Sequence, residues 1–184
     1  MTPNWFIAFP MQVEGMRELP APPSRVRLFS EADLHCTLAF LGSVDAEAAK
    51  RSWLHTVALA DAAPVRGGFT GVRPLGSPRK PSALSAIVGE GEAALSAMTM
   101  EVRATCLEAA GAPEDTRPPL PHMTLARIQR RASGAERREA IRWAEGIDLE
   151  SARFTVSAVA LYTWSEDRQT RLFQIVEARS LDAA

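Results

Sequence analysis

One short segment occurs twice in this chain and constrains its fold more than any other feature. Residues 35–38 read His-Cys-Thr-Leu and residues 122–125 read His-Met-Thr-Leu, about half a chain apart. Both copies fall in apolar runs that predict strands at residues 34–41 and 121–128. Because side chains alternate between the two faces of a strand, His and Thr share one face in each copy. The opposite, apolar face can anchor each strand in a core.

The other hydrophobic patterns predict further strands and helices in alternation. The second half of this order echoes the first, which predicts an α+β fold. We expect a bilobal, pseudo-symmetric duplication of a β-α-β-α-β-type unit, with mainly antiparallel sheets that line a central cleft. The predicted strands are residues 5–9, 34–41, 67–75, 83–88, 121–128, 154–162 and 172–178, and the predicted helices are residues 11–19, 46–60, 92–110 and 135–145.

Length and composition fit one bilobal domain that spans residues 1–184. Hydrophobic residues make up 46% of the 184 residues and charged residues 23%, which supplies a sizeable core without a disulfide or a metal. The net charge of −1 argues against a protein that coats long nucleic acid. A nucleic-acid partner would therefore be held locally, at an end or at a single phosphate.

The chain shows no targeting or membrane signal. Residues 1–10 are apolar but lack a basic leader, and no window approaches the roughly 18 apolar residues of a membrane helix. The only cysteines, Cys36 and Cys106, are too far apart in sequence to resemble a metal-ligand pair or a disulfide framework. These observations predict reduced, buried thiols in a cytoplasmic protein. We expect this protein to be a monomer.

The repeated histidines suit acid-base chemistry on a phosphodiester. The ordinary pKa of histidine lies near 6.5, so at neutral pH one of two facing imidazoles can accept a proton while the other donates one. The hydroxyls of Thr37 and Thr124 can donate hydrogen bonds to non-bridging phosphate oxygens. A single His-x-Thr in a strand would be explained as a half-buried histidine beside a hydroxyl. Two copies in matching strands favour a functional site at His35 and His122, with no metal required.

These motifs resemble the 2H phosphoesterase superfamily, and within it the bacterial and archaeal RNA 2',3'-cyclic phosphodiesterases, historically called 2'-5' RNA ligases. The resemblance spans nearly the whole chain. It is carried by residues 6–10 (Phe-Ile-Ala-Phe-Pro), 35–42 (His-Cys-Thr-Leu-Ala-Phe-Leu-Gly), 78–81 (Pro-Arg-Lys-Pro), 121–127 (Pro-His-Met-Thr-Leu-Ala-Arg) and 161–162 (Leu-Tyr).

The resemblance implies a bilobal fold with its site in the groove between the lobes, and a metal-independent enzyme without a cofactor. One histidine would protonate the leaving 3'-oxygen while the other activates water, which gives a 2'-phosphate end. By position His35 would be the donor and His122 the acceptor, although the two motifs are equivalent in chemistry. The same site could run backwards and join RNA ends through a 2'-5' linkage.

Two further residues are candidates for contact with substrate. Arg127 matches a family arginine that contacts phosphate, and Phe40 could stack on a terminal base. Each follows its histidine by five residues, so strict alternation places it on the opposite face. Each therefore reaches the site only if its strand ends or bulges. Otherwise Arg127 is a surface residue and Phe40 packs in the core.

The other basic and histidine residues carry weaker predictions. Arg79 and Lys80, in a loop rich in Pro and Gly, could steer an RNA backbone or form a solvated loop tip. His55 lacks the threonine two residues later and is expected to be structural.

Other functions remain open from the sequence. The same histidines could act on a small cyclic nucleotide such as ADP-ribose 1'',2''-cyclic phosphate, or the chain could be a non-catalytic binder of RNA ends. A metallohydrolase is disfavoured, because no carboxylate cluster accompanies the histidines.

Overall fold

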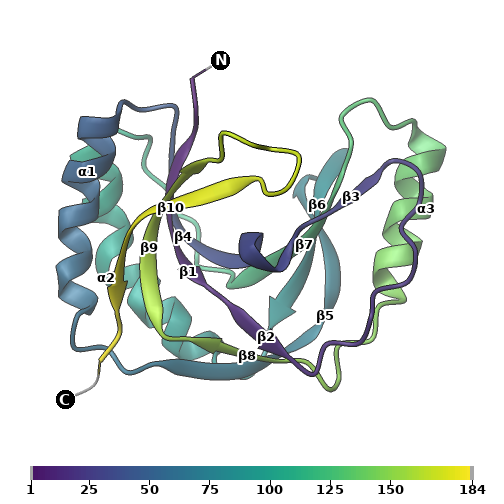
Figure 1. Ribbon diagram of the computed structural model, residues 1–184, viewed down its shortest axis with the longest axis horizontal. Coiled ribbons are helices and arrows are strands. Elements are labelled where there is room, and N and C mark those ends of the chain that lie inside the picture. The colour runs from purple at the N-terminus through teal and green to yellow at the C-terminus, as the bar shows by residue number, and fades with distance from the viewer. Residues whose placement is uncertain (1, 183–184) are drawn as a thin grey trace.

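Two antiparallel sheets form the centre of the molecule in a computed structural model that describes residues 2–182 (Figure 1). The four-stranded sheet has the order β10 (Phe173–Ser180), β9 (Ala158–Trp164), β1 (Trp5–Pro10) and β4 (His35–Gly42). The six-stranded sheet has the order β2 (Gln12–Glu14), β8 (Arg153–Val156), β5 (Val65–Ser77), β6 (Lys80–Val88), β7 (His122–Ile128) and β3 (Val26–Leu28). The predicted α+β class with antiparallel sheets is confirmed.

Helices lie outside the two sheets, at opposite ends of the molecule (Figure 1). Helix α1 (Ala46–Leu54), followed by the 3₁₀ turn η2 (His55–Leu59), and α2 (Glu92–Ala110) pack together beside the four-stranded sheet. Helix α3 (Gly134–Glu145) packs on β5 and β6 of the six-stranded sheet. Helix α2 has the predicted bounds and ends at Gly111, whose φ of 65° closes the helix in the left-handed conformation.

Each sheet takes strands from both halves of the chain. The C-terminal strands β9 and β10 join β1 near the N-terminus, and β2 and β3 join β8 and β7 of the second half. One continuous apolar core extends across both sheets and the helices and includes Ile7, Leu95, Met123 and Phe154. The two lobes are therefore interleaved in sequence.

The helix predicted at residues 11–19 is wrong, because this segment contributes β2 instead. Val13 pairs with Phe154 of β8, so tertiary pairing decides its conformation. Gly15 then turns the chain at φ 69°, and a Cβ there would lie 2.5 Å from the carbonyl oxygen of Ser151. The short strand β3 and the 3₁₀ turn η1 (Glu31–Asp33) that precedes β4 were not predicted from the sequence.

Two other predicted elements are divided in the structure. The helix predicted at residues 46–60 tightens into η2 after Leu54, where the Thr56 hydroxyl donates to the Trp53 carbonyl at 2.7 Å and competes with the helical ladder. The strand predicted at residues 154–162 divides at Ser157. Its first part, β8, belongs to the six-stranded sheet and its second part, β9, to the four-stranded sheet.

We expect Gly67→Ala to destabilise the fold, because the added Cβ would lie 1.9 Å from the backbone oxygen of Glu90. The backbone must shift, which typically costs about 1–3 kcal/mol of unfolding free energy. Gly68→Ala is the matched control, since its Cβ meets nothing closer than 3.4 Å. Urea denaturation of the two variants tests this, and equal stability would contradict the observed approach of β5 to Glu90.

Candidate active site

Both copies of the repeated segment lie at the junction of the two sheets. Strand β4 forms one edge of the four-stranded sheet and contacts β7 of the six-stranded sheet. Burial raises the pKa of the Cys36 thiol in β4 to about 12, and the strands are close enough for the backbone of His122 to oppose part of this rise. A pocket of about 630 Å³ opens beside this junction. The residues predicted from the sequence all line it: His35, Thr37, Phe40, His122, Thr124 and Arg127.

A β-bulge in each strand brings the residue five positions after the histidine to the pocket side. In β4, Ile7 faces Ala39 and Ala8 faces Thr37, so Leu38 is the extra residue. The alternation of faces therefore shifts by one residue after Leu38. Phe40 consequently lies on the same side as His35 and is 57% exposed.

Strand β7 repeats this bulge at the equivalent position. Leu84 faces Ala126 and Ser85 faces Thr124, so Leu125 is the extra residue. Arg127 consequently lines the pocket together with Thr124. The sequence predicted that Phe40 and Arg127 would reach the site only if their strands ended or bulged after the histidine. Both strands contain such a bulge.

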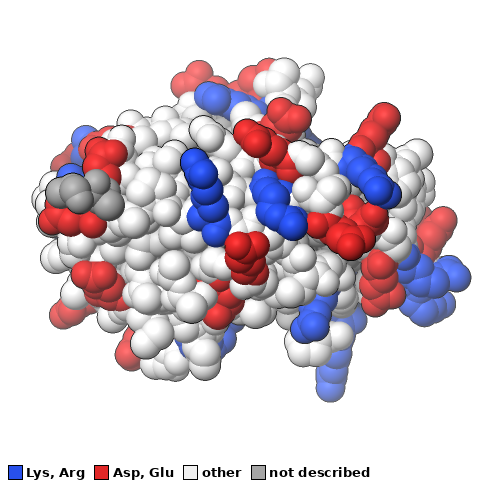
Figure 2. Space-filling model, turned by 90° about the horizontal axis from the view of Figure 1, so that it is seen from below, with Lys and Arg blue, Asp and Glu red and all other residues white. Residues whose placement is uncertain are grey.

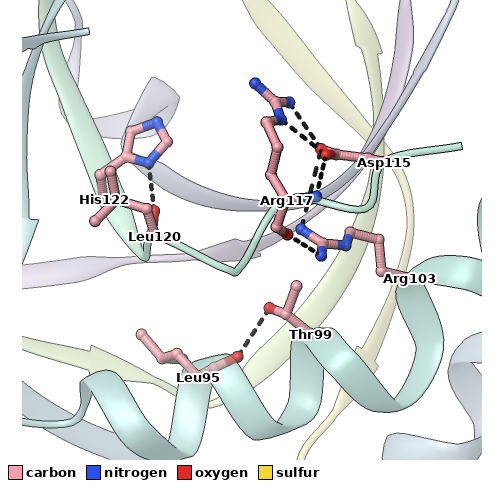
Figure 3. Close-up of polar contacts among 7 residues, drawn as sticks. All are labelled: Leu95, Thr99, Arg103, Asp115, Arg117, Leu120 and His122. Atoms are coloured by element: carbon pink, nitrogen blue, oxygen red, sulfur yellow. Dashed lines mark hydrogen bonds and ion pairs between the residues drawn. The ribbon is translucent and has the colours of Figure 1, made fainter.

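Each catalytic candidate holds its imidazole through the same hydrogen bond. The His35 Nδ1 lies 2.6 Å from the Asp33 carbonyl oxygen. The His122 Nδ1 lies 2.7 Å from the Leu120 carbonyl oxygen, and Figure 3 shows this second pair. A carbonyl can only accept, so both Nδ1 atoms carry the proton. Each ring therefore keeps Nε2 for a substrate, as an acceptor when neutral and as a donor when charged.

The two imidazoles differ in their surroundings. His35 packs among aromatic rings, with centroid distances of 4.9 Å to Phe6, 5.4 Å to Tyr162 and 5.4 Å to Phe173. Burial there lowers the pKa of His35 from 6.5 to about 4, against the opposing effects of the Asp33 carbonyl and carboxylate. Positive charge on His122 and Arg127 lowers this pKa further. At neutral pH His35 is therefore an uncharged imidazole.

The buried side chain of Asp33 fixes the segment that supports His35. Its carboxylate accepts hydrogen bonds from the backbone N–H groups of Leu172 and Phe173 at 2.9 and 3.0 Å, and from the Ser30 hydroxyl at 2.8 Å. Asp33 thus connects the start of β10 to the turn before β4, and Phe173 in turn packs on His35. Asp33 was not predicted from the sequence, where its position two residues before the first histidine is the only local signal.

The threonines are half-buried on the pocket wall. Thr124 Oγ1 lies 3.1 Å from the hydroxyl of Ser85, a buried residue of the neighbouring strand β6. Either oxygen can be the donor, so Ser85 can orient the Thr124 hydroxyl. Thr37 has no side-chain hydrogen bond to any residue that the structure describes.

An ion-pair cluster that the sequence analysis did not single out lines another part of the pocket (Figure 3). Arg117 donates to both carboxylate oxygens of Asp115 at 2.8 Å, and Arg103 of α2 donates to the Arg117 carbonyl. These hydrogen bonds from Arg117 lower the pKa of Asp115 to about 2. Arg79 and Lys80, by contrast, lie exposed at the β5–β6 turn and are not among the pocket-lining residues.

Charge on the molecular surface is mixed in sign. On the face seen in Figure 2, Lys and Arg side chains alternate with Asp and Glu side chains. Within residues 2–182, no group of three or more His, Cys, Asp or Glu side chains is arranged to hold a metal ion. None of the helices described combines the length and the apolar character required to cross a membrane.

Solved structures of other proteins share the fold of this chain. The protein TT0787 of Thermus thermophilus matches with a TM-score of 0.68 and 20% identity, over 97% of each chain. LigT of E. coli, in complex with 3'-AMP, matches with a TM-score of 0.63 and 20% identity, over 97% of each chain.

The sequence profile of the 2'-5' RNA ligase superfamily matches residues 8–168, and the chain belongs to this family. The resemblance that the repeated motifs indicated is therefore confirmed. No curated protein matches the chain significantly.

The low pKa of His35 predicts a loss of stability in acid. The unfolded chain takes up a proton on this residue near pH 6.5, whereas the folded chain does so only near pH 4. Unfolding free energy therefore falls as the pH drops through this window, by at most about 3 kcal/mol from this residue. His35→Gln should remove that share of the decrease.

Urea denaturation between pH 7 and pH 4 measures this effect. His55→Gln is the matched control, because His55 is exposed in η2 and lies outside the pocket with His35. A wild-type decrease that His35→Gln leaves unchanged would show that His35 titrates normally in the folded protein.

Proposed function

We propose that this protein hydrolyses 2',3'-cyclic phosphate ends of RNA to 2'-phosphate ends by metal-independent acid-base catalysis. One observation carries the proposal. Two imidazoles from separate strands line a single pocket, and each commits Nδ1 to a backbone carbonyl and keeps Nε2 for substrate. Two such groups on one phosphodiester supply the base and the acid that the reaction needs.

The surroundings of the histidines favour a division of roles. His35 is uncharged at neutral pH, so its Nε2 is ready to take a proton from the attacking water. His122 then donates its Nε2 proton to the 3'-oxygen as the bond from phosphorus to that oxygen breaks. The product has a 2'-phosphate and a free 3'-hydroxyl. This order is the reverse of the one that position in the family implies.

The remaining pocket residues complete the proposed site. The hydroxyls of Thr37 and Thr124 donate to non-bridging phosphate oxygens, and the guanidinium of Arg127 stabilises their charge. Phe40, exposed beside the pocket, offers a stacking surface for the terminal base. With an RNA hydroxyl in place of water, the reverse reaction joins two ends by a 2'-5' linkage.

We also propose that residues 1–184 act as one bilobal domain and as a cytoplasmic monomer. The apolar core that runs through both sheets supports the single domain. The buried free thiols of Cys36 and Cys106 support a reducing compartment.

Replacing either His35 or His122 with alanine should reduce kcat on a cyclic-phosphate oligonucleotide by about 10² to 10⁴. The loss arises because each variant lacks one proton-transfer group, while the binding residues remain. His55→Ala should keep wild-type activity, and activity should survive a strong chelator. A wild-type protein that binds the oligonucleotide without turning it over would instead be a binder of RNA ends.

A 4-nitrophenyl phosphodiester separates the two roles. Its leaving group departs without a proton, so loss of the acid is tolerated and loss of the base is not. We expect His122→Ala to retain far more of its activity on this substrate than His35→Ala. The opposite ranking would assign the acid to His35.

Arg127→Ala should reduce kcat/KM by roughly 10- to 100-fold, the range expected from losing a charge-assisted hydrogen bond to phosphate. Arg127→Lys should recover only part of this, because an ammonium cannot make the paired contact of a guanidinium. Arg131→Ala is a control outside the pocket-lining residues. Steady-state kinetics on the same oligonucleotide checks all three variants.

A further inference from the structure

Three arginines converge beside the proposed catalytic pocket from three different segments. Arg27 of β3 and Arg127 of β7 are direct partners in the antiparallel pair, so their side chains leave the same face of the sheet. Arg27 donates to the backbone oxygen of Arg168, in the turn between β9 and β10. Burial lowers the pKa of the Arg127 guanidinium, and the positive charge of Arg168 adds to this effect.

Two contacts fix the position of Arg168 without pairing its guanidinium with a carboxylate. Its guanidinium lies over the ring of Trp164, 4.3 Å from the centroid, and its backbone oxygen is held by Arg27. A cation over an aromatic face keeps its N–H donors available at the edges. Arg168 is therefore oriented but still able to bind an anion.

The acidic groups nearby do not neutralise this cluster. Among the residues that the structure describes, no carboxylate lies within 4.0 Å of Arg27, Arg127 or Arg168. The neighbouring carboxylate of Asp167 accepts from the Gln169 N–H and the Thr170 hydroxyl, within its own turn. Glu166 is exposed in the same turn. Like charges on facing strand positions destabilise a sheet, so this arrangement favours an anionic ligand.

The arginine cluster adjoins the pocket through Arg127. Arg127 lines the pocket and its charge acts on His35, whereas Arg27 and Arg168 are not among the lining residues. Because Arg127 belongs to both the pocket and the cluster, an anion held by Arg127 and Arg168 would lie next to a phosphate in the pocket. Two adjacent anion positions that share Arg127 suit two phosphates of the same nucleotide.

Resting on the proposed function, we propose that Arg27, Arg127 and Arg168 form a second anion subsite for a phosphate on the 5'-oxygen of the nucleotide that carries the cyclic phosphate. In an RNA end this group is the last internucleotide phosphate, and in a small substrate it is a 5'-phosphate. The subsite distinguishes both from a nucleoside cyclic phosphate that lacks a second phosphate.

Steady-state kinetics on three substrates tests the subsite. They are a nucleoside 2',3'-cyclic phosphate, its 5'-phosphorylated form, and a dinucleotide with the same terminal nucleoside cyclic phosphate. We expect the wild-type KM to be about tenfold lower for a substrate with a second phosphate, the effect of one charge-assisted contact. Preference for the dinucleotide identifies an RNA end, and preference confined to the 5'-phosphorylated form identifies a small nucleotide.

Arg168→Ala should remove this preference, raise KM for the favoured substrate and leave the bare nucleoside cyclic phosphate little changed. Alanine keeps the backbone oxygen that Arg27 holds, so the turn retains its anchor. Arg171→Ala is the matched control, since it removes an exposed arginine from the same turn. Absence of a wild-type preference, or an equal loss on all three substrates, would overturn the subsite.

Equilibrium binding separates this inference from the catalytic proposal. Calorimetry compares a nucleoside 3'-phosphate with the corresponding 3',5'-bisphosphate on wild type and Arg168→Ala, without any turnover. If no substrate is hydrolysed, the catalytic proposal fails, and tighter bisphosphate binding that depends on Arg168 still supports the subsite. Equal affinity for the two nucleotides overturns it.

Discussion

The extra residue in each of two facing strands is the constraint on which the site depends. Leu38 in β4 and Leu125 in β7 each break the register with the neighbouring strand. Before the bulge, alternation presents His and Thr to the pocket. After it, alternation presents Phe40 and Arg127 to the same pocket. Without the bulges, strict alternation would place Phe40 and Arg127 on the strand faces opposite the histidines, away from the pocket.

His35 and His122 occupy equivalent positions in β4 and β7, but their surroundings differ. Both rings are held through Nδ1 by the carbonyl two residues earlier, so their hydrogen bonds repeat with the sequence. Their surroundings do not repeat, because the aromatic rings around His35 come from β1, β9 and β10. Asp33 ties β10 into this arrangement through two backbone N–H groups. A symmetric motif thus lies in an asymmetric setting, in which burial lowers the pKa of His35.

Most elements could be predicted because their sequence patterns are local. Helix α2 has the bounds that its apolar spacing and Gly111 indicate, and β4 and β7 follow from their apolar runs. The failures occur where pairing partners override local preference. Val13 lies in a strand because it pairs with Phe154 of β8. The predicted strand at residues 154–162 divides because its two ends join different sheets. No local sequence pattern indicates which sheet a strand will join.

The sequence by itself determined the chemistry of the candidate site: the two His-x-Thr pairs, their shared strand faces and the family to which the chain belongs. Only the tertiary structure decided that Phe40 and Arg127 reach the pocket, that burial lowers the pKa of His35, and that Arg27 pairs with Arg127 and donates to the backbone oxygen of Arg168. The physical reason is that residue identity and alternation are properties of neighbours along the chain. Register, burial and electrostatic interaction depend instead on groups that are distant in sequence and meet only on folding.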